Sequence, residues 1–361
     1  MPYRDGSQYE TVTSPASPER DVSGAISTVL EVITLVANIL PLLVAVKVKR
    51  RADRTVTDYL IAALSTNDML AVVTTLPVSL PSYFNRRWLG GKMTCEFYQF
   101  CLFWFQISAM LLVTAMSFDR LLAVWRPLYY RHCRRTFRAL LTIAIIYGIT
   151  MVASALPLIG LAPPVMVSSS GRLCQSWLLI RSENWHQTVL PFTLLAIIWI
   201  LMFAVLLCNW FLLKHLLQYK KRLKQPNLQT YLDKKSFKDF TRLVIVVAIL
   251  FYLTWLPVLV VGTLTQCGLR VDELIALYAF SSTTLNALLN PFVYCALSRQ
   301  YRRGYMEIFH GILSSLRIQH LCGACHRREY QRSSDLNDEE GYQAASHVPS
   351  AEFVEQKVTV L

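Results

Sequence analysis

The sequence predicts an all-α membrane protein, a seven-transmembrane helix bundle with a short amphipathic helix after the seventh span. Three observations support this fold class. The 361-residue chain is 54% hydrophobic and only 16% charged, a composition more apolar than that of soluble domains. Its apolar residues gather in seven runs, each long enough to cross about 30 Å of hydrocarbon. The segments between the runs alternate between strongly and weakly basic.

Each run is predicted to be a helix, because backbone polar groups in lipid must form hydrogen bonds within their own segment. The predicted spans are, in order, Gly24–Val46, Thr57–Leu80, Phe97–Val124, Phe137–Leu161, Val189–Leu213, Phe240–Leu264 and Leu274–Leu297. The chain then divides into an extracellular N-terminal tail (1–23), the bundle (24–297), an amphipathic juxtamembrane helix (298–318) and a disordered cytoplasmic tail (319–361). This last segment is polar and acidic, with few aliphatic residues to bury.

The basic residues set the orientation of the bundle in the membrane. Lysine and arginine are concentrated in the segments that follow spans one, three and five, and they are sparse in the opposite segments. The basic side is cytoplasmic by the positive-inside rule, so we predict a multi-pass membrane protein with an extracellular N-terminus. The formal net charge of +13 then reflects topology and contact with anionic inner-leaflet lipid, and no nucleic-acid partner is expected.

Polar side chains within the spans are costly in lipid and mark functional candidates. Asn38 lies in span one and Asp68 in span two, while Asn286 and Asn290 lie four residues apart on one face of span seven. Three interpretations remain open: a shared polar site that binds a small cation such as sodium at Asp68, an Asp68 carboxyl kept protonated by burial, or hydrogen bonds that hold the helices together. No other metal and no organic cofactor is expected.

Prolines interrupt six of the seven spans and are expected to bend them. Such bends are pivots for rigid-body motion. In span six, Phe251 and Trp255 lie four residues apart just before Pro257, so both rings face the same side where the helix bends. In span seven, Pro291 directly follows Asn290.

Two cysteines predict a disulfide on the oxidising side of the membrane. Cys95 begins span three and Cys174 lies in the outer loop after span four, so a bond between them would tether this loop to the bundle. Cys267 is a third outer cysteine with no obvious partner. Near the C-terminus, Cys322 and Cys325 lie in the cytoplasmic segment CGACH, a context that favours palmitoylation over haem attachment.

The stretch SFDRLLAVWRP places an acid and a base, Asp119 and Arg120, where span three meets a basic segment. Together with other motifs in chain order, it resembles the rhodopsin-like (class A) G protein-coupled receptors over roughly residues 24 to 318. The matching pieces are Asn38, LSTND with Asp68, Trp88, Cys95, DRLLAV with Asp119 and Arg120, FYLTWLP with Phe251, Trp255 and Pro257, and NPFVY from Asn290 to Tyr294.

The resemblance implies a plasma-membrane receptor that converts extracellular ligand binding into activation of a heterotrimeric G protein, with arrestin as a further partner. Asp119, Arg120 and Tyr294 would form the G protein switch: Arg120 pairs with Asp119 at rest and is freed when span six swings outward. The resemblance also implies an activation core made up of Asn38, Asp68, Phe251, Trp255, Pro257, Asn286, Asn290 and Pro291. Trp199 stands eight residues after Pro191, where the family carries a tyrosine that stabilises the active state.

Residues in the outer halves of the spans indicate which classes of ligand suit the site. The candidate pocket residues are largely apolar: Leu102, Phe103, Gln106, Val258, Leu259 and Phe280. They suit a lipid or an apolar peptide side chain, and Leu102 replaces the acid by which the family's amine receptors bind ammonium groups. PLYYRHCRR and ALPLIGLAP resemble segments of the prostanoid branch, yet Ser281 replaces that branch's carboxylate-binding arginine. A prostanoid-like lipid and a peptide therefore both remain candidates.

Other classes of protein fit the sequence less well. A transporter is expected to show repeated topology, and seven unpaired spans show none, while a non-signalling scavenger of the same fold usually loses the Asp-Arg motif. No enzyme is predicted, because the seven histidines are scattered over loops and tail and form no catalytic group. The chain ends KVTVL, in which Thr359 and Leu361 match the pattern that PDZ domains bind.

Overall fold

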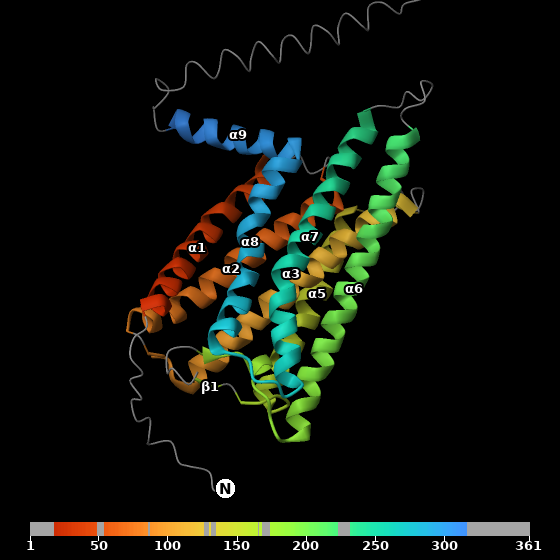
Figure 1. Ribbon diagram of the computed structural model, residues 1–361. Helices are drawn as coiled ribbons and strands as arrows, with labels where there is room; N and C mark the ends of the chain where they lie inside the picture. The colour runs from red at the N-terminus through yellow and green to blue at the C-terminus, as the bar shows by residue number, and fades with distance from the viewer. Residues whose placement is uncertain are drawn as a thin grey trace, which may run out of the picture. The chain divides into compact units, whose positions relative to one another are not determined.

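The computed structural model describes residues 18–48, 54–85, 87–125, 130, 135–164, 166–167, 174–222 and 232–315 (Figure 1). The spanning helices are α1 (Pro18–Leu43), α2 (Val56–Phe84), α3 (Gly91–Trp125), α5 (Arg135–Ala155), α6 (Trp185–Arg222), α7 (Leu232–Gln266) and α8 (Glu273–Leu297). The helix α9 (Arg299–Ser315) follows them. The predicted seven-helix bundle with a short helix after the seventh span is confirmed.

Six of these helices are long and apolar enough to cross a membrane: α1 with its π-helical extension η1 (Val44–Val48), α2, α3, α5, α6 and α7. The seventh, α8, is less apolar because its outer half carries four consecutive hydroxyl residues, Ser281 to Thr284, and its inner half carries two asparagines. It packs between α1 and α7. Its polar groups therefore have helical neighbours, and α8 completes the bundle.

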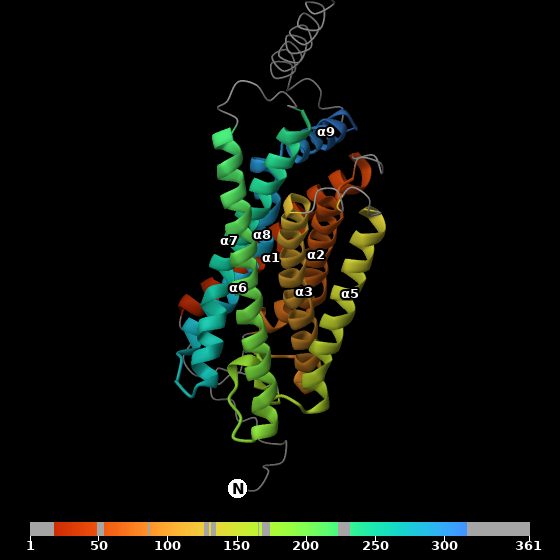
Figure 2. The ribbon, with the colours of Figure 1, turned by 90° about the vertical axis from the view of Figure 1, so that its right-hand side faces the viewer.

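The helix α3 is the central element of the bundle. It contacts α2, α5, α6 and α7, and Figure 2 shows α2, α3 and α5 side by side. Large side chains of α3 such as Met110, Leu112 and Met116 are at most 2% exposed. The pair Asp119–Arg120 lies near the inner end of this same helix, so its surroundings are set by several neighbours at once.

Local sequence signals set the ends and bends of the helices. Thr55 caps the start of α2, because its hydroxyl accepts a hydrogen bond from the Asp58 backbone N–H while the Asp58 carboxylate accepts one from the Thr55 N–H at 2.9 Å. Asp272 caps α8 by accepting a backbone hydrogen bond at 2.8 Å. Prolines lie inside α1, α2, α6, α7 and α8, whereas Pro157 lies in a 3₁₀ turn, η3 (Leu156–Ile159), that ends the fourth span.

The outer loop between α5 and α6 contains a short pair of strands that the sequence did not predict. Strand β1 (Met166–Val167) runs antiparallel to β2 (Cys174–Gln175). A 3₁₀ turn, η4 (Trp177–Leu179), follows β2 and contacts α7. Strands of two residues leave almost no alternation in a sequence, which explains why the pattern did not reveal them.

Residues 1–305 form one compact unit and residues 306–361 a second, of which the structure describes 306–315. The palmitoylation candidates Cys322 and Cys325 and the terminal residues Thr359 and Leu361 lie outside the described residues.

Candidate functional site

The Asp119–Arg120 pair is almost completely buried. The Asp119 side chain is 8% exposed and that of Arg120 is 4% exposed. Nη2 of Arg120 donates to Oδ2 of Asp119 at 2.7 Å. A charge-assisted hydrogen bond of this length is among the stronger kinds in proteins, so the structure contains the resting pair that the family resemblance implied.

Three further groups converge on the Asp119 carboxylate. Tyr130 donates to Oδ2 at 3.0 Å and accepts a hydrogen bond from Arg120 at 3.0 Å. Arg138 of α5 donates to the other oxygen, Oδ1, at 3.2 Å, and its guanidinium lies over the Tyr130 ring, 4.5 Å from the centroid. The Thr57 hydroxyl of α2 lies 3.5 Å from Oδ2. One carboxylate of α3 is thereby joined to both α2 and α5.

The protonation of Tyr130 suits its place in this cluster. Tyr130 lies between α3 and α5 in the chain, and burial raises the pKa of its phenol above the ordinary value. The positive charge of Arg120 opposes this rise, and the negative charge of Asp119 adds to it. The hydroxyl is therefore neutral around pH 7 and donates to Asp119 without adding a second anion.

Tyr294, the third predicted member of the switch, lies in a second group of side chains. Its ring is fully buried and stands 5.7 Å from the ring of Tyr301 in α9, and its hydroxyl has no hydrogen-bond partner among the described residues. Tyr301 donates to Oδ1 of Asp58 at 3.2 Å. Burial, together with the Asp58 carboxylate, raises the pKa of the Tyr301 phenol well above its ordinary value. Tyr301 thus links Tyr294 to the capped start of α2.

Buried polar side chains connect α1, α2 and α8 in the middle of the bundle. Asn38 of α1 donates to a backbone carbonyl of α8 at 3.1 Å. Asn290 of α8 donates to Asp68 of α2 at 3.3 Å, and Pro291 directly follows it. Asp68 and Asn286 are 4% and 2% exposed. Contacts of this kind hold membrane helices together because lipid offers no competing partners.

The aromatic pair of α7 lies beside Pro257, the proline inside this helix. Phe251 and Trp255 stack with ring centroids 5.3 Å apart, and both are buried. Pro257 lies two residues beyond Trp255 and cannot donate a backbone hydrogen bond. At this level Ser282 of α8 donates to the Thr254 carbonyl at 2.7 Å. The segment of α7 around Pro257 is therefore joined directly to α8.

The six predicted ligand-site residues come from α3, α7 and α8, toward the outer end of the bundle: Leu102, Phe103, Gln106, Val258, Leu259 and Phe280. Phe103, Val258 and Leu259 are buried. Gln106 is the polar member of the six, and its Nε2 donates to Oγ1 of Thr283 in α8 at 3.1 Å. This hydrogen bond joins α3 to α8 at the candidate site.

The chain's own outer loop packs against this site. The segment Cys174–Ile180, called the loop cover below, places Trp177 against Phe103 with ring centroids 4.8 Å apart. Trp177 is 1% exposed. An indole so deeply buried contributes to packing as a core residue does. The aromatic ring that the sequence suggested for ligand contact is therefore already in contact with the protein itself.

Two glutamines hold the backbone of the loop cover. Gln99 of α3 donates to the Cys174 carbonyl at 3.0 Å. Gln266 of α7 donates to the carbonyls of Leu178 and Ile180 at 2.9 and 3.1 Å. Both glutamines are at most 4% exposed. The loop cover is thus fixed by hydrogen bonds at both ends.

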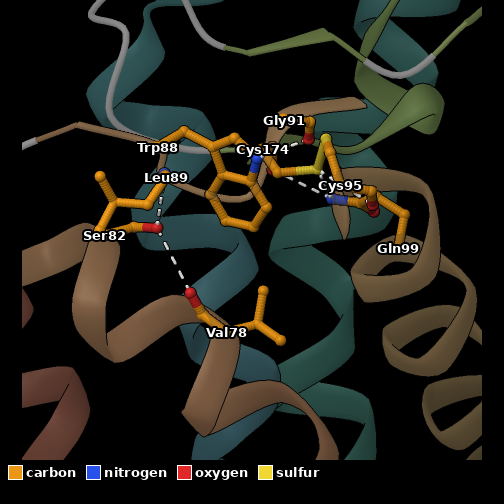
Figure 3. Close-up of a disulfide and its surroundings, with 8 residues drawn as sticks. All are labelled: Val78, Ser82, Trp88, Leu89, Gly91, Cys95, Gln99 and Cys174. Carbon is orange, nitrogen blue, oxygen red and sulfur yellow. Dashed lines mark hydrogen bonds between the residues drawn. A yellow bond between two sulfur atoms is a disulfide. The ribbon is translucent and has the colours of Figure 1, made fainter. Parts of the chain in front are cut away.

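The predicted disulfide between Cys95 and Cys174 is confirmed, with the two Cα atoms 5.5 Å apart. Figure 3 shows it next to Gln99 and near Trp88, whose indole donates to the Gly91 carbonyl at 2.9 Å. The bond attaches the start of the loop cover covalently to α3.

Replacing Trp177 with alanine should destabilise the protein by roughly 3–5 kcal/mol, the usual cost of removing a large buried aromatic side chain. Thermal unfolding of the purified protein checks this, with Trp185→Ala as the matched control because Trp185 is 69% exposed. Equal melting temperatures for the two variants would show that Trp177 does not contribute to packing.

The structure corrects one assignment in the fifth span. Counting eight residues from Pro191 matched Trp199 to the family's active-state tyrosine, but Trp199 donates to Thr263 near the outer end of α7, at 3.1 Å. Pro191 lies only six residues into α6 and is therefore a poor reference point. The polar side chain of α6 near the switch is Asn209, which donates to Ser117 of α3 at 2.9 Å.

Three other residues of the site were not singled out from the sequence. Tyr130 and Arg138 contact Asp119, and Trp177 covers the outer site. Arg138 carried a usable signal, because it lies in the first turn of α5, where the helix dipole disfavours a cation. Such a position suggests that an anion lies nearby.

A seven-helix membrane bundle with a buried acid–base pair at its inner end and a tethered loop at its outer end has the features of a membrane receptor. The chain belongs to the rhodopsin-like family of G protein-coupled receptors: the family model described as 7 transmembrane receptor (rhodopsin family) matches residues 37–294. The protein is a multi-pass receptor of the plasma membrane, as the sequence predicted.

Individual proteins similar to this chain are also receptors. Galanin receptor type 2 of Rattus norvegicus is 24% identical over 267 residues, covering 71% of this chain and 68% of the relative. Prostaglandin E2 receptor EP4 subtype of Homo sapiens is 24% identical over 330 residues, covering 78% of this chain and 66% of the relative. The crystal structure of squid rhodopsin shares the fold with a TM-score of 0.66 and 18% identity, covering 86% of this chain and 91% of that chain.

Proposed function

We propose that this receptor responds to an apolar extracellular ligand of the lipid class and activates a heterotrimeric G protein when Arg120 leaves Asp119. The observation that carries the proposal is the make-up of the outer site, where five of the six candidate residues are apolar and Gln106 provides the hydrogen-bonding group. Apolar walls with a few placed polar groups are typical of sites for small apolar ligands.

The prostanoid-like lipid is the first candidate within this class. The similarity to a receptor named for prostaglandin E2 supports it. Ser281 stands in place of the prostanoid branch's arginine. We therefore expect the polar end of the ligand to form hydrogen bonds with Gln106 and Thr283 and to lack an arginine partner.

A peptide ligand is the second candidate. The similarity to a receptor named for galanin is consistent with this alternative.

The experiment that tests the proposal is a screen of prostanoids, other lipids and peptides on cells that express the full chain. Second-messenger responses are measured beside the Arg120→Ala variant at equal surface expression. We expect a prostanoid-type lipid to give a response that Arg120→Ala abolishes and that Gln106→Leu weakens. A response to peptides alone would select the second candidate.

Sodium at Asp68 is a further proposal. Oxygen atoms of Ser65, Asn286 and Asn290 are buried and accept no hydrogen bond from the described residues. Ser65 lies one helical turn from Asp68, and Asn290 is already bonded to it. These oxygens suit a hard cation, which would offset the buried charge of Asp68.

The proposal also includes three features of the cytoplasmic side: arrestin binding, palmitoylation and PDZ binding. Arrestin is the expected second partner of the inner face. Cys322 and Cys325 are the proposed palmitoylation sites, and Thr359 with Leu361 the proposed PDZ-binding pair.

A further inference from the structure

Among the described residues, the side chains that contact Asp119 carry two positive charges against its single negative charge. Two guanidinium groups, those of Arg120 and Arg138, contact one carboxylate. The contacts from Tyr130 and Thr57 come from neutral hydroxyl groups. The two arginines use different oxygens, Oδ2 at 2.7 Å and Oδ1 at 3.2 Å. Either arginine can therefore leave while the carboxylate keeps a cationic partner.

Arg138, the second cation at Asp119, matters because the Asp119 carboxylate is buried. The Asp119 side chain is 8% exposed, and a carboxylate left without a partner at such a position is strongly destabilised. If Asp119 contacted Arg120 alone, release of Arg120 would create that situation. With Arg138 in place, Asp119 remains paired, and repulsion between the two guanidinium groups weakens the hold on Arg120.

The charge of Arg138 is stabilised by Asp119 and not by its own helix. Arg138 is the fourth residue of α5, where the helix dipole disfavours a positive charge. Its side chain is 22% exposed, so solvent screens it only in part. The Asp119 carboxylate and the face of the Tyr130 ring provide the compensating contacts.

We infer that Arg138 is a positioning residue of the switch, which keeps Asp119 neutralised when Arg120 is released and thereby favours the signalling state. The inference rests on the proposed function, in which Arg120 leaves Asp119 during activation. The inference also predicts the direction in which substitution of Arg138 changes signalling. A residue that merely restrains the resting state would raise signalling when it is removed, whereas removal of Arg138 should lower it.

The test is the binding of nucleotide-free G protein to the purified full-length receptor in lipid nanodiscs, using the subtype that responds in the ligand screen. Arg138→Gln should weaken binding on the order of ten-fold, because it leaves the Asp119 charge uncompensated when Arg120 departs. Arg138→Lys keeps the charge and should retain most of the affinity. Arg303→Gln removes the same charge from an exposed position of α9 and should leave binding unchanged.

The same substitution in a receptor that already carries Asp119→Asn shows whether Arg138 acts through Asp119. In an Asp119→Asn receptor the charge on which Arg138 acts is gone, so adding Arg138→Gln should have no further effect. Tighter binding by Arg138→Gln, or an equal loss in the Asp119→Asn background, would overturn the inference.

Two further controls distinguish a failure of folding, or of the proposed function, from a failure of the inference about Arg138. Thermal unfolding of each variant identifies any that fail to fold. If Arg138→Gln does not fold, Tyr130→Phe decides, because it removes another donor to Asp119 and should weaken binding in the same direction; tighter binding by this variant counts against the inference. If the wild-type receptor itself binds no G protein, the proposed function fails before the role of Arg138 is at issue.

Discussion

Replacing Arg120 with alanine should abolish G protein activation while ligand affinity stays close to that of the wild type. The side chain is 4% exposed and bonded to Asp119 at the inner end of α3. The candidate ligand residues of α3, from Leu102 to Gln106, lie several helical turns away toward its outer end. The signalling loss should be at least about ten-fold, because the variant removes the charged group that the switch releases.

The measurement is ligand-stimulated second-messenger formation beside ligand binding on the same cells. Arg303→Ala serves as the control, since it removes an exposed arginine of α9. Unchanged signalling by Arg120→Ala at equal surface expression would contradict the mechanism. Parallel loss of ligand binding would instead indicate that the variant disturbs the whole bundle.

Replacing Cys95 or Cys174 with serine should each lower ligand binding and thermal stability, and the double variant should be no worse than either single one. The bond closes a separation of 79 residues, and removal of a native disulfide typically costs about 2–5 kcal/mol. Because both substitutions remove the same bond, their effects cannot add.

Ligand binding and melting temperature should be measured for both single variants and the double variant. Cys267→Ser is the matched control, because Cys267 is exposed and free. Additive losses from Cys95→Ser and Cys174→Ser would show that the two residues act separately. A loss as large in Cys267→Ser would point to a general effect of removing an outer cysteine.

The helices were predictable from the sequence because their causes are local. Length and apolarity suffice to place a span, and the capping pair Thr55 and Asp58 can be read from spacing alone. The strands β1 and β2 were not predictable, since two residues each carry no pattern and their pairing depends on where the disulfide holds Cys174.

The candidate site was predictable only where a motif occupies a single helix. Asp119 and Arg120 are adjacent in sequence, so their contact could be expected. The approach of Arg138 and Tyr130 depends on how α5 packs against α3. The burial of Trp177 against Phe103 depends on the path of a loop. Such contacts arise from tertiary packing, which residue spacing does not encode.

The contact between Trp177 and Phe103 also has a consequence for the rate of ligand binding. A ligand that enters between α3 and α7 must wait until the loop cover moves, because Gln99 and Gln266 hold it in place. Association should then proceed through a slow opening step, so the observed rate should level off at high ligand concentration and should not rise linearly. Dissociation must cross the same barrier, which predicts long residence times and responses that outlast the removal of ligand.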